Sequence, residues 1–390
     1  MITTSCETRY QDFATFFAQT DLFAQCREWE ARLHAVTGRD VERVLSRPPG
    51  RYRPERLMIL ISPAAQNYLE IMAQQARALT IRRFGKTIGL YAPLYLSNYC
   101  CNRCTYCGFS AEHPFKRRRL SVDEVMAEAR ILRSEGFTDL LLVSGEDRSV
   151  VTVDYLIELT ERLRTRFSTI SIETHQLESD EYGELFAAGI DGVTLYQETY
   201  DPEAYARFHL SGPKADYDCR LKAPDSFASA GMRRLGLGAL LGLSPHWRLE
   251  VLALGMHGHY LMRKYWQSQI SFSFPRLRPA QEVDAQTFDH SMSDKDLVQM
   301  ILALRLCFSD AGLVLSTREA PNFRNALVKL GITRMSAGSK TNPGGYTTDA
   351  ESLEQFSIDD DRSAAQIADM LKQQGLEPVW KDWDAAFSHI

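Results

Sequence analysis

The stretch Ile88-Gly-Leu-Tyr-Ala-Pro-Leu-Tyr-Leu96 is followed after three residues by Cys100-Cys-Asn-Arg-Cys104-Thr-Tyr-Cys107. An apolar run of this length predicts a buried β-strand, and the cysteines begin the loop that leaves its C-terminal end. In barrels of parallel strands, the loops at the C-terminal ends of the strands carry the reactive groups. The rest of the fold follows from the apolar runs and helices that alternate after this strand and loop.

Short apolar runs alternate with amphipathic helices over the next 250 or so residues, the typical length of a (β/α)8 barrel. Ser121 and Glu124 predict a capping box at the start of the first helix, and Gly136 ends that helix. Strict alternation favours parallel strands with right-handed crossovers. We therefore expect an α/β fold of the (β/α)8 TIM-barrel type, with a doubly wound open sheet as the alternative. The other seven predicted strands are Asp139–Ser144, Thr169–Thr174, Gly192–Tyr196, Arg234–Leu241, Gln269–Phe274, Leu313–Thr317 and Ile332–Ser336.

The regions on either side of the barrel differ from it in pattern. Residues 1–80 have apolar positions at helical spacing and no strand signal, so we expect a helical N-terminal extension. Residues 81–345 form the predicted barrel. Residues 346–390 contain an acidic linker, a short predicted helix at 364–373 and an aromatic end. We expect this short C-terminal segment to pack on the barrel.

The composition bounds the class of protein. The chain has 390 residues, of which 44% are hydrophobic, and a formal net charge of −5. This charge argues against a nucleic-acid-binding protein, since those carry a basic excess. No apolar run approaches the roughly 18 residues of a membrane span, and charged residues stand where a secretory signal would be apolar. We therefore expect a cytoplasmic protein without nucleic-acid or membrane partners.

The cysteine pattern indicates metal chemistry. Four of the eight cysteines fall within positions 100–107, and a local cluster in a long cytosolic chain is typical of a metal or redox site. Cys100, Cys104 and Cys107 have the CxxxCxxC spacing that holds three irons of a [4Fe–4S] cluster and leaves the fourth iron open. Zinc, which prefers four ligands in paired knuckles, and buried unreactive cysteines are the alternatives.

The cysteine motif, with aromatic Tyr106 before its last cysteine, resembles the signature of the radical S-adenosylmethionine (SAM) superfamily. The resemblance implies that SAM binds the open iron and is cleaved by one electron to methionine and a 5′-deoxyadenosyl radical. It further implies that Cys100, Cys104 and Cys107 ligate the cluster, that Tyr106 lies near the adenine, and that Cys101 is not a ligand.

Further segments resemble the aromatic amino-acid lyases within that superfamily, above all their tyrosine-cleaving branch in thiamine biosynthesis. The resemblance runs through almost the whole chain, and the segments that carry it are 94–110, 143–146, 196–200, 316–319 and 339–346. It implies cleavage of the Cα–Cβ bond of L-tyrosine to 2-iminoacetate and p-cresol. The imine then supplies the thiazole of thiamine, which implies a thiazole synthase as partner.

Other functions stay open from the sequence alone. The tryptophan lyases, or another radical SAM amino-acid lyase, share the barrel and the arginine-bearing strand end. The HydG branch carries further cysteines near its C-terminus, whereas Cys307 is the last cysteine here, so we expect another branch. An iron–sulfur electron carrier or scaffold is the non-enzymatic alternative.

Polar residues at the strand ends are the candidate contacts of SAM or substrate. The alternatives are an ordinary turn at 144–146 and, for the others, groups that are solvated or bonded to neighbouring backbone. Ser144-Gly145-Glu146 stands where the superfamily has a Gly-Gly-Glu motif, with Ser in place of the first Gly. Glu173 ends the third predicted strand, and Gln197 and Glu198 end the fourth, where polar groups line the site of a barrel.

The resemblance also suggests residues for an amino-acid substrate. Arg318 ends the seventh predicted strand, and a guanidinium binds a carboxylate through two parallel hydrogen bonds. An ion pair with Glu319 or another acid of the barrel rim is the alternative. Ser336 and Ser339 follow the eighth strand and are candidates for the same carboxylate or the amine. Tyr95 precedes the cysteine loop and is a candidate contact of the amine, or else a core tyrosine.

The run Lys116-Arg-Arg-Arg119 is the densest basic segment. Such runs are mostly solvated, but this one lies shortly after the cysteine loop. We therefore also consider that it docks an acidic one-electron donor, flavodoxin or ferredoxin, through electrostatic steering.

Overall fold

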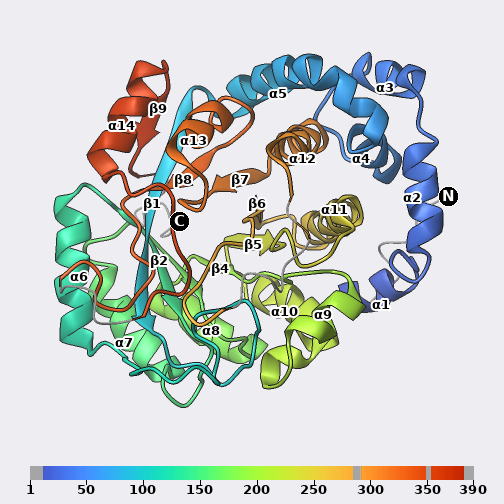
Figure 1. The fold of residues 1–390 in the computed structure, drawn as a ribbon. Coiled ribbons are helices and arrows are strands. Elements are labelled where there is room, and N and C mark those ends of the chain that lie inside the picture. The colour runs from blue at the N-terminus through green and yellow to red at the C-terminus, as the bar shows by residue number, and fades with distance from the viewer. Residues whose placement is uncertain (1–11, 284–289, 291, 348–352, 382–390) are drawn as a thin grey trace.

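The computed structural model describes residues 12–283, 290, 292–347 and 353–381. Eight parallel strands form a closed barrel, because β1 pairs with both β2 and β8, and helices surround it (Figure 1). The predicted (β/α)8 barrel is confirmed, and the open-sheet alternative is wrong. The strands are β1 (Thr87–Ser97), β2 (Asp139–Ser144), β3 (Thr169–Glu173), β4 (Gly192–Thr194), β5 (Arg234–Gly238), β6 (Gln269–Ser273), β7 (Gly312–Leu315) and β8 (Arg334–Ser336).

The crossover helices pack their apolar faces on the strands, and together they form one core. The predicted capping box is present at α6, where Ser121 accepts a hydrogen bond from the Glu124 N–H and Glu124 accepts one from the Ser121 N–H. The crossover helices are α6 (Val122–Ser134), α7 (Val153–Leu163), α8 (Ser179–Ala188), α9 (Pro202–Phe208), the 3-10 turn η2 (Pro213–Ala215), α10 (Tyr217–Ser229), α11 (Trp247–Lys264), α12 (Asp294–Cys307) and α13 (Pro321–Leu327).

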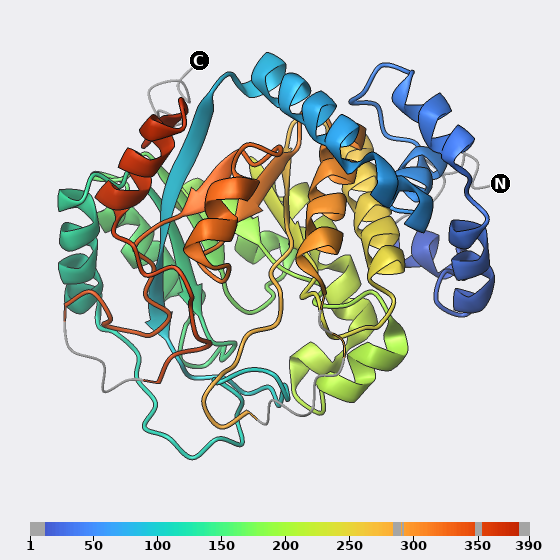
Figure 2. The same ribbon diagram turned by 45° about the horizontal axis from the view of Figure 1, so that its top comes forward.

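The N-terminal segment before β1 contains five α-helices and one 3-10 helix among its described residues. Its later helices α4 and α5 pack against α11 and α12 on the outside of the barrel (Figure 2). Phe13 of α1 stacks on the ring of His257 in α11, with 3.8 Å between the ring centroids. The elements are α1 (Phe13–Ala18), α2 (Cys26–His34), α3 (Gly38–Leu45), α4 (Pro54–Leu60), the 3-10 helix η1 (Pro63–Tyr68) and α5 (Leu69–Phe84).

The C-terminal segment contains a strand that the sequence analysis missed. Helix α14 (Ala364–Gln373) lies where a helix was expected, but β9 (Glu377–Val379) then adds to the sheet, parallel to the start of β1. Before α14, the chain crosses the opposite end of the barrel, where the Gly108 N–H donates to the Gln355 carbonyl over 3.1 Å. The segment therefore contacts both ends of the barrel.

Seven of the eight predicted strands differ from the observed ones only at their ends, and the largest difference at one end is in β5, which stops at Gly238 instead of Leu241. Beyond Thr194, the N–H groups of Leu195 and Gln197 still donate to carbonyls of β5, at Gly236 and Gly238. Glu198 then adopts a left-handed backbone with φ of 69°, which turns the chain out of the sheet. The regular strand β4 is thus two residues shorter than the predicted 192–196, but hydrogen bonding to β5 continues through the whole predicted range.

Candidate active site

The carboxyl ends of the strands meet at one rim, where two connected cavities open. The first encloses about 900 Å³ of empty space and the second about 700 Å³, mouths included; both lie in the usual range of ligand pockets. They share the side chains of Val143, Glu173, Tyr196, Pro275, Arg318 and Phe356.

The loop after β1 carries the cysteines into the first cavity. It pairs with the chain that leaves α9: the Arg103 N–H donates to the Ser211 carbonyl, over 3.0 Å, and the Leu210 N–H donates to the Arg103 carbonyl, over 2.9 Å. The thiols that line this cavity belong to Cys100, Cys104 and Cys107. Cys101 is exposed instead, and its thiol donates to the Glu146 carbonyl over 2.9 Å.

The three thiols line one cavity without converging on a single point. Within the described residues, no three His, Cys, Asp or Glu side chains converge closely enough to bind one metal ion, as a zinc site would require. Burial raises the pKa of all three thiols, and that of Cys107 to about 11. The cavity therefore presents three separate sulfur donors whose thiolate forms need positive charge nearby.

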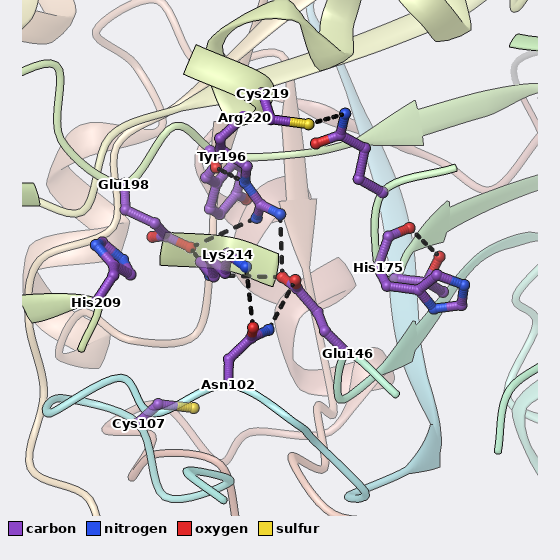
Figure 3. Close-up of polar contacts among 12 residues, drawn as sticks. Asn102, Cys107, Glu146, His175, Tyr196, Glu198, His209, Lys214, Cys219 and Arg220 are labelled. Atoms are coloured by element: carbon purple, nitrogen blue, oxygen red, sulfur yellow. Dashed lines mark hydrogen bonds and ion pairs between the residues drawn. The ribbon is translucent and has the colours of Figure 1, made fainter. Parts of the chain in front are cut away.

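A network of four charged side chains lies beside the cysteine loop (Figure 3). Lys214 Nζ lies 2.7 Å from Glu198 Oε1 and 3.6 Å from Glu146 Oε1. Arg220 donates to Glu146 Oε1 over 3.1 Å and approaches Glu198 within 4.0 Å. Asn102 of the cysteine loop donates to Glu146 Oε2 over 3.1 Å. The negative charges of two glutamates are thus balanced by the positive charges of a lysine and an arginine, and the network is hydrogen-bonded to the loop through Asn102.

The same network keeps both acids ionised. Burial acts to raise the pKa of Glu146, but Arg220 and Lys214 outweigh it and lower the pKa to about 2. The pKa of Glu198 is also lowered, because Lys214 and Arg220 outweigh its burial. Sequence reasoning proposed these two acids but missed Lys214 and Arg220, the latter 74 residues from Glu146 along the chain.

Gly145 is needed for contact with the loop. Its N–H donates to the Ser97 carbonyl over 2.8 Å, and a Cβ built there would lie only 2.9 Å from the carbonyl carbon of Tyr99. The glycine therefore lets the end of β2 pack on the backbone before Cys100. The neighbouring Ser144 lines the first cavity, and its buried hydroxyl has no hydrogen-bond partner within the described chain.

Tyr106 is held by a neutral histidine. The Tyr106 hydroxyl lies 2.9 Å from His209 Nε2, while His209 Nδ1 lies 2.8 Å from the Tyr205 carbonyl. Because a carbonyl only accepts, Nδ1 carries the proton and Nε2 accepts from Tyr106. Burial lowers the pKa of His209 to about 4. Tyr106 therefore lines the first cavity in a fixed orientation.

Arg318 lines both cavities and has no acidic partner among the described residues. Its guanidinium carbon lies 3.4 Å from the centroid of the Phe356 ring. The predicted alternative, an ion pair with Glu319, is wrong, because Glu319 pairs with Arg276. Burial lowers the pKa of Arg318, because the charged guanidinium loses hydration there, and a bound anion would offset that loss.

The remaining candidates for the substrate line the second cavity. Ser336 and Ser339 have buried hydroxyls without a hydrogen-bond partner in the described part of the chain. The Tyr95 hydroxyl already donates to Gln355 Oε1 over 2.7 Å. Gln355 and Phe356 come from the segment before α14 and line the first cavity, a contribution that the strand pattern did not reveal.

Glu173 occupies the junction of the two cavities. It lines both, and no hydrogen bond or ion pair holds its carboxyl among the described residues. Burial and the neighbouring Glu198 raise the pKa of Glu173 to about 7, although Arg318, Lys214 and Arg220 act against this. Of the acids predicted at the site, only Glu173 changes its charge near neutral pH.

One predicted residue is not brought to the site. Gln197 lines neither cavity and is buried, and both polar atoms of its amide lack a partner in the described structure. Leu195, Tyr196 and Glu198, on either side, do line the first cavity. The prediction that Gln197 binds the cofactor here needs correction.

The sequence matches two family models. The model of the Radical SAM superfamily matches residues 94–254, and the model of the Biotin and Thiamin Synthesis associated domain matches residues 273–377. No described helix is long and apolar enough to span a membrane.

Curated relatives match over nearly the whole length. The 2-iminoacetate synthase of Escherichia coli (strain K12) is 46% identical over 355 residues, which cover 91% of this chain and 93% of that protein. The 2-iminoacetate synthase of Salmonella typhimurium is 45% identical over 370 residues, 94% of this chain and 97% of that one.

Solved structures share the fold. HydG, a maturase of the [FeFe]-hydrogenase, has a TM-score of 0.87 at 31% identity, covering 95% of this chain and 82% of that chain. Methylornithine synthase (PylB) has a TM-score of 0.66 at 20% identity, covering 90% of this chain and 97% of that chain, and this match supports the fold alone.

The contact of Gly145 with the cysteine loop predicts that Gly145→Ala lowers the free energy of unfolding by about 1–3 kcal/mol, the usual cost of overpacking. Gly183 in α8 is the matched control, since a Cβ there meets nothing within 4 Å. Gly183→Ala should raise the free energy of unfolding by about 0.5–1 kcal/mol. Urea unfolding of both variants measures the difference, and equal stabilities would contradict the close contact.

Proposed function

The chain belongs to the 2-iminoacetate synthase family of radical SAM lyases. We propose that it cleaves the Cα–Cβ bond of L-tyrosine with the cluster and SAM in the first cavity and tyrosine in the second. The products are 2-iminoacetate and p-cresol, and the imine supplies the thiazole of thiamine. The observation that supports this division is the shared wall. Glu173, Tyr196 and Arg318 face both the cavity with the cysteines and the cavity with the unpaired serines.

The superfamily implies a [4Fe–4S] cluster and SAM, and the first cavity fits them. In our proposal, Cys100, Cys104 and Cys107 each bind one iron, and the fourth iron is open to SAM. The exposed position of Cys101 supports a ligand set of three. When bound, the reduced cluster and SAM supply a 5′-deoxyadenosyl radical that takes a hydrogen atom from the substrate amine.

The charged network suits the amino-acid end of SAM, which carries one ammonium and one carboxylate. Glu146 and Glu198 provide negative charge, and Lys214 and Arg220 provide positive charge within 4.0 Å of those acids. Charges that already balance one another can exchange partners with a zwitterion without leaving a net buried charge. Tyr106, Ser144 and Gly145 complete the wall of this cavity.

The second cavity suits the amino-acid end of tyrosine. Arg318 offers a buried guanidinium without a described acidic partner, and the hydroxyls of Ser336 and Ser339 are free donors beside it. Together they would hold the substrate carboxylate. Tyr95 and Gln355, bonded to each other, close the wall toward the cysteine loop and leave the amine directed to the junction.

In our proposal, the substrate amine lies beside Glu173 at the junction of the two cavities. An amino acid carries an ammonium group near neutral pH, whereas the hydrogen atom must come from a neutral amine. In our proposal, the Glu173 carboxylate accepts one proton from the ammonium, and the neutral amine then gives its hydrogen atom to the radical. Its position between the cavities and its lack of another partner support this role.

Two protein partners complete the proposal. The enzyme requires a one-electron donor, for which we propose flavodoxin or ferredoxin. The unstable imine requires a nearby consumer, for which we propose a thiazole synthase. Both follow from the family chemistry rather than from a surface of this chain.

The function predicts that the anaerobically reconstituted protein, given SAM, dithionite and tyrosine, forms 5′-deoxyadenosine, p-cresol and glyoxylate from the hydrolysed imine. Chromatography of the reaction measures all three. The Arg318→Gln variant should raise the KM for tyrosine about 10- to 100-fold, because hydrogen bonds to charged groups contribute about 1.5–3 kcal/mol. Its KM for SAM should change little.

The same assay contains the outcomes that would contradict the proposal. Consumption of tryptophan in place of tyrosine would make the substrate wrong. Absence of 5′-deoxyadenosine from a protein with a full cluster would favour the iron–sulfur carrier. An equal rise in the KM for SAM and for tyrosine would contradict a specific role of Arg318 in binding tyrosine.

The role of Glu173 predicts a pH dependence. Its carboxyl is protonated below about pH 7 and charged above, and only the charged form accepts a proton. The rate should therefore rise through about pH 7, and Glu173→Gln should lower kcat at neutral pH by about 100-fold or more. In this variant, the rate should rise only near the higher pKa of the ammonium itself. Rates from pH 6 to 10 measure both curves.

Glu173→Asp, which keeps an acid, should restore part of kcat and the rise near neutral pH. The charged groups that face Glu173 are Glu198, Arg318, Lys214 and Arg220, and none of them loses its charge in the substitution. A Glu173→Gln variant with the wild-type pH curve, or one with only a raised KM for SAM, would show that Glu173 binds the cofactor instead.

A further inference from the structure

Arg117 stands inside the basic run that was considered as a docking site. The structure gives the three arginines of this run different roles. Arg118 pairs with Glu124 over 2.9 Å, and the exposed Arg119 lies over the Tyr155 ring at 4.5 Å. Arg117 is only half-exposed and turns back into the cysteine loop.

The guanidinium of Arg117 donates only to backbone carbonyls. Nη1 donates to the carbonyls of Asn98 and Phe109, each over 2.7 Å. Nη2 donates to those of Ser110, over 2.5 Å, and His113, over 3.5 Å. A planar guanidinium with five N–H donors can satisfy several acceptors at once, which a lysine cannot do in the same geometry.

These acceptors bracket the cysteines. Asn98 lies two residues before Cys100, and Phe109 lies two residues after Cys107. One side chain thus joins the two ends of the loop that carries all three thiols. The backbone beside it reinforces the closure, since the Arg118 N–H donates to Asn98 Oδ1 over 2.6 Å and the Asn98 N–H donates to the Arg118 carbonyl over 3.1 Å.

The charge of Arg117 also acts on the thiols. Its contacts with the carbonyls of Asn98 and Phe109 hold the cation two residues along the chain from both Cys100 and Cys107. Burial lowers the pKa of Arg117, and the negative charges of the two cysteines act in the opposite direction. A positive charge near a cluster favours the reduced state, and local charge is one of the factors that set cluster potentials. No acidic side chain pairs with this guanidinium in the described chain.

We propose that Arg117 is a positioning residue, which closes the cluster-binding loop through its carbonyl contacts and raises the reduction potential of the cluster through its charge. This inference rests on the proposed ligation by Cys100, Cys104 and Cys107. It assigns Arg117 to the cluster itself, rather than to a surface that binds the electron donor.

The test compares Arg117→Gln and Arg117→Lys with Arg118→Gln and Arg119→Gln in the anaerobically reconstituted full chain. Iron per chain, the rate of iron loss to a chelator and the midpoint potential from an EPR-monitored titration are measured. Arg117→Gln should lose iron faster and shift the potential to more negative values. Arg117→Lys keeps the charge but not the planar fork of donors, so it should lose iron faster with a smaller shift. The two control variants should match the wild type.

The outcomes separate the possible explanations. Wild-type iron retention and potential in Arg117→Gln would overturn the proposal. Slower reduction by an acidic protein donor at an unchanged potential would also overturn it and restore the docking hypothesis. If Arg117→Gln does not fold, Arg117→Lys decides, because wild-type behaviour of that variant in both readouts excludes the carbonyl clamp. Failure of the proposed ligation itself would appear first in the wild type, as a protein that binds no cluster.

Discussion

The parallel pairing of β1 with both β2 and β8 closes the sheet, and every part of the site depends on that closure. It brings the carboxyl ends of the strands to one rim, so that residues from distant parts of the sequence surround common cavities. The cysteine loop after β1, Glu146 after β2, Glu173 at the end of β3 and Arg318 after β7 all face this space. Opening the barrel at β1 would separate the loop from its neighbours on both sides.

The rim is also where the fold tolerates buried charge. Buried ion pairs are seldom stabilising by themselves, yet Glu146, Glu198, Lys214 and Arg220 gather beside the cysteines. In the proposed function their role is binding, because a site lined with balanced charges can receive a zwitterion. Glu173 differs from these acids, since it has no described partner and a pKa of about 7. The site thus separates charges that hold a ligand from a carboxyl that can exchange a proton.

The sequence was sufficient for the barrel and the cysteine loop, because both are encoded locally. Apolar runs mark the strands, the capping residues mark α6, and the CxxxCxxC spacing marks the cysteines that line the first cavity. The sequence was insufficient where interacting residues lie far apart along the chain. Lys214 and Arg220 look like solvated charges on η2 and α10, and only the closed barrel brings them to Glu146.

The strand β9 and the side-chain orientation of Gln197 were also not predicted correctly, because the local sequence pattern does not encode them. β9 has three residues, with a proline at its centre, and gives no strand pattern. Gln197 was expected at the cavity from its position after a strand, but its buried side chain lines neither cavity, unlike those of Leu195, Tyr196 and Glu198. The orientation of single residues at a strand end depends on where the strand stops, and the left-handed backbone of Glu198 could not be read from the sequence.

The central claim is that three cysteines hold the cluster and leave one iron free for SAM. Mössbauer spectroscopy of the protein reconstituted with ⁵⁷Fe, recorded before and after addition of SAM, tests it most directly. The account predicts that one iron of the four changes its isomer shift and quadrupole splitting on SAM addition, while the other three do not. Four equivalent irons whose spectrum is unaffected by SAM would contradict it.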